Sequence, residues 1–151
     1  MHNKAMSRKR VLVIDDNSDD ILLLKIAARR TAAPIELSIV KNGQAAIEYL
    51  QRHEGSVQNA ENPLPDLVLL DIHLPKCDGF EVLRWIRKRP DLRALKVFMW
   101  TGSEDPTHRK LAKELEADLF LAKSGDERPL VEMIGSVAES AAEEPRYCQA
   151  V

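Results

Sequence analysis

Five polar residues of this 151-residue chain directly follow short apolar stretches, where they could do chemistry together: Asp15, Asp16, Asp71, Thr101 and Lys123. Carboxylates held close together repel one another and therefore favour a bound cation. An all-oxygen site suits Mg²⁺, which proteins commonly share with phosphate oxygens. A carboxylate can also act as a nucleophile and form an aspartyl phosphate, which a hydroxyl and an ammonium could bind and neutralise. These residue types therefore indicate Mg²⁺-dependent phosphoryl transfer to Asp71.

The apolar stretches that would position these residues alternate with segments of helical spacing. The expected strands are 11–14, 35–40, 67–70, 97–100 and 119–122, and the expected helices are 19–30 (capped by Asn17 or Ser18), 43–52, 80–88, 106–116 and 130–140. Four of the stretches are apolar at nearly every position, which is typical of strands covered on both faces. The pattern predicts an α/β fold: a flavodoxin-like (βα)5 doubly wound parallel sheet of strand order 2-1-3-4-5.

This strand order makes the first and third strands neighbours, about 4.8 Å apart. The carboxylates that end these two strands should therefore crowd together at the carboxyl edge of the sheet, where open α/β folds place their sites. We expect one domain over residues 8–140, flexible termini at 1–7 and 141–151, and a long surface loop at 53–65, with no room for a second domain.

Composition excludes several classes of partner and location. The formal charge is -2, and the basic cluster Arg8-Lys9-Arg10 is short, so nucleic acid is not an expected partner. No stretch approaches the roughly 20 apolar residues of a membrane span, and the N-terminus lacks the pattern of a signal peptide. Cys77 and Cys148 match no metal-binding or redox spacing. A cytoplasmic protein without membrane contact is expected.

The polar residues at the strand ends resemble the signature of response regulator receiver domains. The matching motifs are Asp15-Asp16, the run Asp71-Ile-His-Leu-Pro-Lys-Cys-Asp-Gly79, Thr101-Gly102, and Lys123. Each motif alone is weak, but all of them occur in order, each at a strand end, and the resemblance covers about residues 8–140. It implies a phospho-accepting response regulator of a two-component phosphorelay: a signalling switch rather than an enzyme, with Mg²⁺-dependent self-phosphorylation and autodephosphorylation.

The resemblance implies roles around the metal ion and the acceptor. Asp71 matches the phosphorylated aspartate, which also contacts the metal. Asp16 matches the direct Mg²⁺ ligand, and Asp15 matches its partner, which often acts through water. His73 matches the residue whose backbone carbonyl ligates the metal, and its side chain is expected to be exposed.

The resemblance also implies roles in switching. Thr101 matches the hydroxyl that moves to the phosphoryl oxygen, and Lys123 matches the cation that pairs with phosphate. Phe120 matches the aromatic switch residue that swings inward after phosphorylation. Ser103, together with His73, matches the two variable positions that tune the dephosphorylation rate.

A narrower resemblance concerns partners. The long loop before residue 67 and the lack of an output domain are similar to the small response regulators that accompany bacterial phytochromes. This similarity implies a sensor histidine kinase, a bacteriophytochrome, that docks near helix 19–30. Output would pass to a protein partner or through a homodimer formed by helix 106–116, strand 119–122 and helix 130–140.

One residue departs from the family pattern. The family usually has a proline after the lysine, with a cis bond that aims the ammonium, whereas Ser124 follows Lys123 here. A cis bond without proline costs about 3 kcal/mol. Either the strained bond is kept or other contacts aim the lysine.

Three other functions fit the residues less well than the switch does. A phosphatase with an aspartyl nucleophile usually places a second aspartate two residues later, where this chain has His73. A flavin-binding domain would need a phosphate-cradling loop after the first strand, where Asp15 and Asp16 would repel phosphate. A phosphorylation-independent, receiver-like binding module remains as the alternative, although the intact set of five residues argues against it.

Local sequence features carry three smaller expectations. The run of apolar residues at 21–24 is either a wide core face with one exposed leucine or a docking patch for the kinase. Gly79 is expected to supply a turn conformation before the third helix. Trp85 and Trp100 should lie in or near the core, and Trp100 precedes Thr101, so its fluorescence should respond to events at the site.

Overall fold

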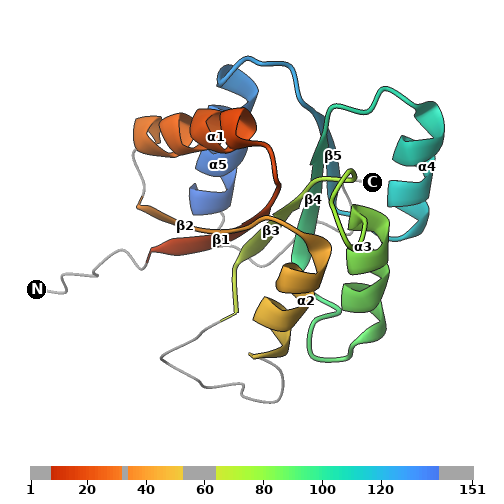
Figure 1. Ribbon diagram of the computed structural model, residues 1–151. Coiled ribbons are helices and arrows are strands. Elements are labelled where there is room, and N and C mark those ends of the chain that lie inside the picture. Colours follow the sequence, from red (N-terminus) through yellow and green to blue (C-terminus); the bar gives the residue numbers. More distant parts are fainter. Residues whose placement is uncertain (1–7, 32–33, 53–63, 140–151) are drawn as a thin grey trace, which may run out of the picture.

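Strands and helices alternate along the chain in a computed structural model that describes residues 8–31, 34–52 and 64–139 (Figure 1). In chain order the elements are β1 (Lys9–Ile14), α1 (Ser18–Arg30), β2 (Ile35–Val40), α2 (Gly43–Gln51), β3 (Leu67–Leu70), α3 (Gly79–Lys88), β4 (Lys96–Thr101), α4 (Pro106–Glu114), β5 (Leu119–Ala122) and α5 (Arg128–Glu139). The predicted flexible termini and most of the predicted 53–65 loop lie outside the described residues.

The five strands form one parallel sheet of order β2-β1-β3-β4-β5, as the sequence predicted. β1 lies between β2 and β3, and Ile14 at its end pairs with both Val40 and Leu70. The carboxyl ends of β1 and β3 are therefore adjacent. The site residues that follow these strands are brought together by sheet register alone.

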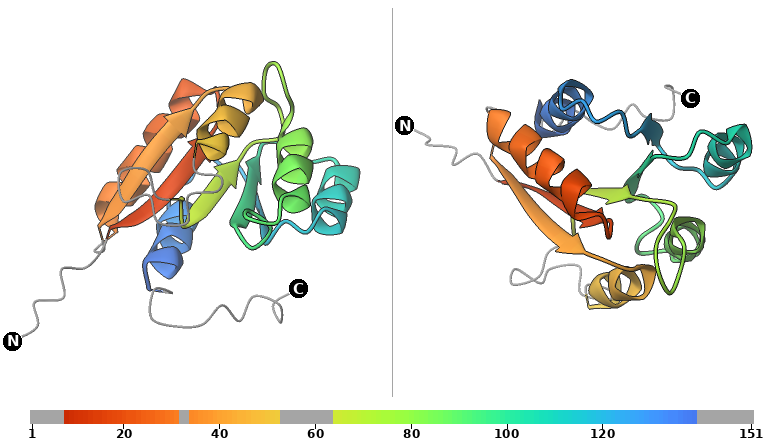
Figure 2. Two further views of the ribbon diagram at one scale, coloured as in Figure 1. Left: turned by 90° about the horizontal axis from the view of Figure 1, so that it is seen from below. Right: turned by 45° about the horizontal axis from the view of Figure 1, so that its top comes forward.

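Each face of the sheet has its own core, because side chains along a strand alternate between the two faces. Leu12 and Ile14 of β1 join a cluster with α2, α3 and α4, whereas Val11 and Val13 join one with α1 and α5. Figure 2 shows these two helical layers on opposite sides of the sheet. This double covering explains why β1, β3 and β4 are apolar at nearly every position.

Most helices begin at a polar cap that stands at the carboxyl edge of the sheet. The caps are Asn17 for α1, Asn42 for α2, Asp78 for α3 and Asp105 for α4, and each side chain accepts a backbone N–H of the first turn. Asn17 rather than Ser18 therefore caps α1. Helix α4 ends before the predicted Glu116, because Glu116 adopts a positive φ of 64° that a helix cannot contain.

Arg87 of α3 ties together the opposite, amino end of β4 and β5. Its guanidinium donates to the backbone carbonyls of Arg93, Leu95 and Glu116. It also pairs with Asp118 at 3.1 Å, and that carboxylate accepts the backbone N–H of Val97 in β4. One arginine thus links the amino ends of β4 and β5, away from the predicted site.

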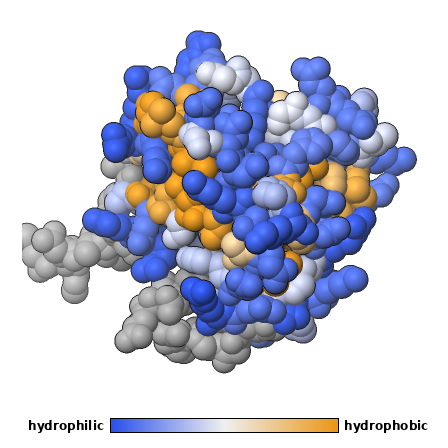
Figure 3. Space-filling model, in the orientation of Figure 1, coloured by the Kyte–Doolittle hydropathy of each residue, from blue (hydrophilic) through white to orange (hydrophobic). Residues whose placement is uncertain are grey.

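The apolar run of α1 divides between core and surface. Ile21 and Leu24 are buried, whereas Leu22 is 58% exposed. Figure 3 shows an apolar area over α1 and β2, where Leu22 and Ile39 line a shallow hollow. Within the described ranges, no helix is long and apolar enough to cross a membrane.

Candidate functional site

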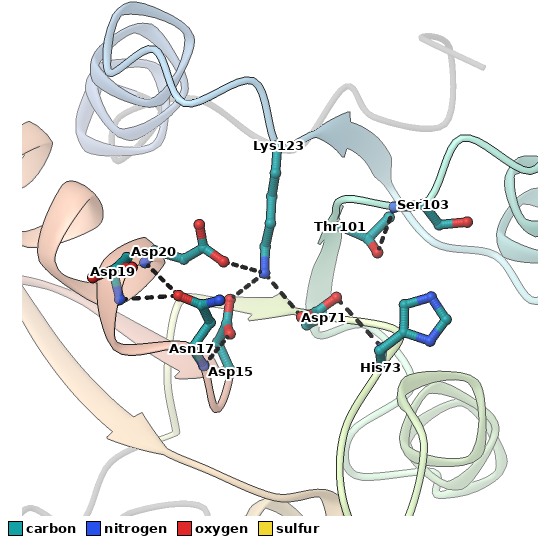
Figure 4. A network of polar contacts seen from close by, with 9 residues as sticks. All are labelled: Asp15, Asn17, Asp19, Asp20, Asp71, His73, Thr101, Ser103 and Lys123. Atoms are coloured by element: carbon teal, nitrogen blue, oxygen red, sulfur yellow. Dashed lines mark hydrogen bonds and ion pairs between the residues drawn. The ribbon is translucent and has the colours of Figure 1, made fainter.

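Backbone hydrogen bonds continue past the strand ends and fix the positions of the site residues, whose side chains are drawn in Figure 4. The N–H of Asp15 donates to Val40 at 3.1 Å, and the N–H of Asp71 donates to Ile14 at 3.0 Å. At the other side of the site, the N–H of Lys123 donates to the carbonyl of Thr101 at 2.8 Å. The sheet itself therefore determines where each functional side chain starts.

Three carboxylates share the edge between β1 and β3. Asp15, Asp16 and Asp71 can each offer an oxygen such that these oxygens all lie within 4.8 Å of one another. Asp15 is 1% exposed, Asp71 is 6% exposed and Asp16 is exposed. Burial raises the pKa of Asp15 above its usual value, although contacts with Lys123 oppose the shift. A buried carboxylate beside two other carboxylates favours a nearby cation.

The donor set fits a divalent metal ion. One oxygen of Asp15, Oδ2, is buried and makes no hydrogen bond with any described residue; its described contact is an ion pair with Lys123. The Asp16 side chain reaches solvent, so the cluster is open on one side. Oxygen ligands of this kind, partly open to water, suit hard divalent cations.

Lys123 is held by three carboxylates rather than one. Its Nζ lies 2.8 Å from Asp15 Oδ2, 2.8 Å from Asp20 Oδ2 and 2.9 Å from Asp71 Oδ2. Burial alone would lower the pKa of this ammonium, but the three carboxylates raise it above its usual value. The lysine is thus a permanent cation directly beside the predicted acceptor.

The Lys123–Ser124 peptide bond is trans. Of the two possibilities that Ser124 left open, the structure therefore has the second, in which other contacts aim the lysine. These contacts are the three carboxylates and the ring of Trp100, whose centroid lies 5.0 Å from Nζ. Trp100 is 2% exposed, so the expected near-core position is confirmed, and the half-buried Trp85 packs against the other core.

Thr101 and Ser103 line the side of the site toward α4. Thr101 is fully buried, and its hydroxyl oxygen accepts the N–H of Ser103 at 3.3 Å, which leaves the hydroxyl hydrogen available to donate. The Ser103 hydroxyl bonds to Nδ1 of His108. The exposed His73 ring packs edge-on against His108, with ring centroids 5.8 Å apart. Both predicted variable positions are therefore linked through one histidine.

Phe120 lies on β5 away from the carboxylates, half-buried against α4. The guanidinium carbon of Arg109 stands 4.6 Å above its ring. The two residues also line a surface hollow between α4 and β5 together with Leu119, which is 42% exposed. The predicted switch residue thus has open space beside it.

Gly79 is required for a different reason than the sequence analysis expected. It begins α3 with an ordinary negative φ, so no turn conformation demands glycine. A Cβ at this position would lie 2.1 Å from the carbonyl oxygen of Asp71. The glycine instead allows α3 to pack directly against the backbone of the acceptor residue.

Sequence reasoning missed two residues of this site, Asp20 and His108. Asp20 contacts Lys123 because the first turn of α1 points back over the sheet edge. Its place in the first turn of the helix that directly follows Asp15 and Asp16 was the available signal, since that turn must begin at the same sheet edge. His108 lies in the first turn of α4 and reaches Ser103 only through the shape of the intervening loop, which no spacing rule predicts.

Comparison with known proteins identifies one family and two similar regulatory proteins. The family model described as the response regulator receiver domain matches residues 11–135. The response regulator Rcp1 of Synechocystis sp. is 32% identical over 137 residues, which cover 91% of each chain. A probable methanogenesis regulatory protein, FilR2 of Methanothrix harundinacea, is 34% identical over 75% of this chain and 70% of its own.

Three solved structures that match this chain share its fold and are response regulators. The phosphorylated cyanobacterial phytochrome response regulator RcpA matches with a TM-score of 0.74 and 30% identity over 96% of this chain and 97% of that one. The Mn²⁺-bound form of Rcp1 matches with a TM-score of 0.74 and 32% identity over 91% and 99%. The bacteriophytochrome response regulator RtBRR matches with a TM-score of 0.71 and 30% identity over 86% and 78%.

Proposed function

Because the chain belongs to the response regulator receiver domain family, we propose that it accepts a phosphoryl group on Asp71 from the phosphohistidine of a sensor histidine kinase. The domain that does so spans residues 8–140. The kinase is of the phytochrome class, as the cyanobacterial and bacterial relatives suggest. The observation that carries the proposal is the ion pair of Lys123 with Asp71 inside a cluster of three carboxylates.

The transfer requires one bond to form and one to break. An oxygen of the Asp71 carboxylate attacks phosphorus, the bond from phosphorus to the histidine nitrogen breaks, and its electron pair returns to the imidazole. Asp71 is only 6% exposed, and contacts with Lys123 and with the backbone N–H of His73 hold its two oxygens in a largely fixed direction. Such preorganisation is a main contribution that a protein makes to phosphoryl transfer.

The surrounding side chains balance the charge of the phosphoryl group. Lys123 keeps its proton and pairs with a phosphoryl oxygen, and the Thr101 hydroxyl donates to another. Mg²⁺, held by Asp15, Asp16, Asp71 and the backbone carbonyl of His73, would supply further neutralisation of the acceptor and the phosphoryl oxygens. Hydrolysis of the aspartyl phosphate by water would then reset the switch.

The output of the switch lies at the face formed by α4, β5 and α5. Phosphorylation draws Thr101 toward the site, which frees space for Phe120 to move inward from its position under Arg109. Exposed Leu119 and the hollow beside Phe120 would change with it and so alter binding to a partner or a second copy. Kinase docking involves the exposed Leu22 of α1.

The deciding experiment is phosphorylation by acetyl phosphate, with and without Mg²⁺, followed by intact mass measurement. The matched control is Asp71→Asn, which preserves shape and removes the nucleophile. We expect the mass of one phosphoryl group on the wild type with Mg²⁺ only, and none on the variant. A folded wild type that binds Mg²⁺ but gains no mass would instead support the phosphorylation-independent binding module.

A further inference from the structure

Asp20 is the acid in the Lys123 network that stands outside the metal-binding set. It lies in the first turn of α1, and its Oδ2 is 2.8 Å from Nζ of Lys123 (Figure 4). The carboxylates that can share a metal ion are Asp15, Asp16 and Asp71. Asp20 therefore serves the lysine and not the metal.

The ammonium has three N–H donors, and three carboxylates stand within 2.9 Å of it. Two of these partners, Asp15 and Asp71, are also proposed metal ligands. A divalent ion bound to these two carboxylates would neutralise part of their negative charge and so weaken their attraction for the ammonium. Among the described residues of this network, Asp20 would then be the partner whose charge is undiminished.

The chain holds Asp20 in place for this task. Its backbone N–H donates to the Asn17 side chain at 3.1 Å, which fixes the first turn of α1. Its side chain is 24% exposed, against 1% for Asp15 and 7% for Asp71. A carboxylate at the rim, on a capped helix, can keep a lysine over the site without being desolvated with the metal ligands.

We propose that Asp20 is a positioning residue for Lys123, which keeps the ammonium aimed at the phosphoryl site once a divalent metal ion occupies Asp15 and Asp71. The proposal rests on the proposed function, since it assigns Asp20 a part in the same phosphoryl transfer. Without Asp20 the lysine has two alternatives in the metal-bound protein. Its ammonium either turns away from the site or stays on Asp15 and Asp71, where it competes with the metal ion for these carboxylates.

The test uses Asp20→Asn, with Asp19→Asn as the matched control. Asp19 is the preceding acid in the same helical turn, and it is exposed, so its change removes the same charge. Asp20→Glu retains a carboxylate on a longer arm and tests rescue. All variants are made in a Trp85→Phe background, which leaves Trp100 as the single tryptophan of the chain, 5.0 Å from the lysine.

Two readouts are measured on each variant after its fold is checked by circular dichroism. The first is the Trp100 emission spectrum with and without saturating Mg²⁺, together with the Mg²⁺ Kd from the titration. The second is the rate of phosphorylation by acetyl phosphate at saturating Mg²⁺. For Asp20→Asn we expect an altered Mg²⁺-bound emission spectrum and a rate lower by about fivefold, typical of losing one partly exposed charged contact. Asp19→Asn should stay within about twofold of the background protein, and Asp20→Glu should recover much of the loss.

The outcomes separate this proposal from the proposed function. If no protein, including the background, gains phosphoryl mass, the proposed function fails, but the emission readout still tests Asp20. If the background is phosphorylated and Asp20→Asn matches Asp19→Asn in both readouts, the positioning role is overturned. Should Asp20→Asn not fold, Asp20→Ala takes its place in the same two measurements, because it also removes the carboxylate that contacts Lys123.

Discussion

Replacing Lys123 with methionine should destabilise the metal-free protein strongly. The change keeps most of the volume of the side chain but leaves Asp15 and Asp71, whose side chains are 1% and 7% exposed, without their cation. Removing one partner of a buried ion pair costs about 3–5 kcal/mol. The alternative open to a carboxylate of ordinary pKa 3.8 is protonation, which at pH 7 costs about 4 kcal/mol. Both routes predict a similar loss.

Urea unfolding of wild type and Lys123→Met at pH 7.5, without and with saturating Mg²⁺, measures this loss. Mg²⁺ should reduce the difference in the free energy of unfolding between the two proteins by half or more. A bound cation replaces the positive charge that the variant lacks, and it stabilises the folded state because it binds that state and not the unfolded chain. Lys25→Met removes an exposed lysine of α1 and should change the free energy of unfolding by less than about 0.5 kcal/mol.

The same variant predicts a dependence on pH. Burial raises the pKa of Asp15, and without Lys123 the largest opposing contact is gone, so that pKa rises further. The folded variant then takes up a proton that the unfolded chain has released, and its stability increases as the pH falls. The loss at pH 5.5 should be smaller than at pH 7.5, by up to about 3 kcal/mol for one proton. A variant as stable as wild type, or one insensitive to both Mg²⁺ and pH, would refute the view that Lys123 balances buried charge.

Three further predictions concern other parts of the molecule. Gly79→Ala should lower the free energy of unfolding in urea by about 2 kcal/mol or more, because its Cβ would meet a backbone oxygen at 2.1 Å that cannot move aside. Gly135→Ala, with nothing within 4 Å of its Cβ, should be neutral or stabilising by up to about 1 kcal/mol, and equal effects of the two changes would contradict the packing argument. Burial raises the pKa of Cys77 to about 11, so in a Cys148→Ser background its labelling by a thiol reagent should be slow at pH 7 and rise about tenfold per pH unit until that value; a plateau near pH 8.5 would exclude this. In the single-tryptophan background, Trp100 emission should change on adding saturating Mg²⁺ and a phosphoryl analogue, and an unchanged spectrum would show that the lysine beside it does not move.

The strand ends were predictable because a parallel sheet leaves little freedom. Apolar runs identify buried strands, and right-handed crossovers leave few strand orders, so Asp15, Asp71 and Lys123 must meet at one edge. The contacts of side chains that arise on helices were not accessible in this way. Asp20 reaches Lys123 through the phase of α1, and that phase depends on whether Asn17 or Ser18 is the cap, which the sequence alone leaves open.

Gly79 shows a second limit of prediction from the sequence. A motif can indicate that Gly79 matters, but a glycine can be needed for a positive φ, for a close backbone approach, or for both. The φ value and the Asp71 carbonyl that a Cβ would meet depend on how α3 packs against the end of β3, which the residue types of the run do not reveal. The assignment of the residue was therefore right and its cause was wrong.

The arginine at the far end of the sheet also has a mechanical consequence. Arg87 holds the carbonyl of Glu116, just past the end of α4, and the side chain of Asp118, just before β5. The amino end of α4, near Ser103, is held by contacts between side chains and a loop. Because Arg87 holds residues beyond the carboxyl end of the helix, we expect α4 to turn about that end, with the pivot opposite the acceptor. Small movements at the site should therefore tilt α4 about Arg87 rather than slide it, and the displacement would be largest beside the site itself.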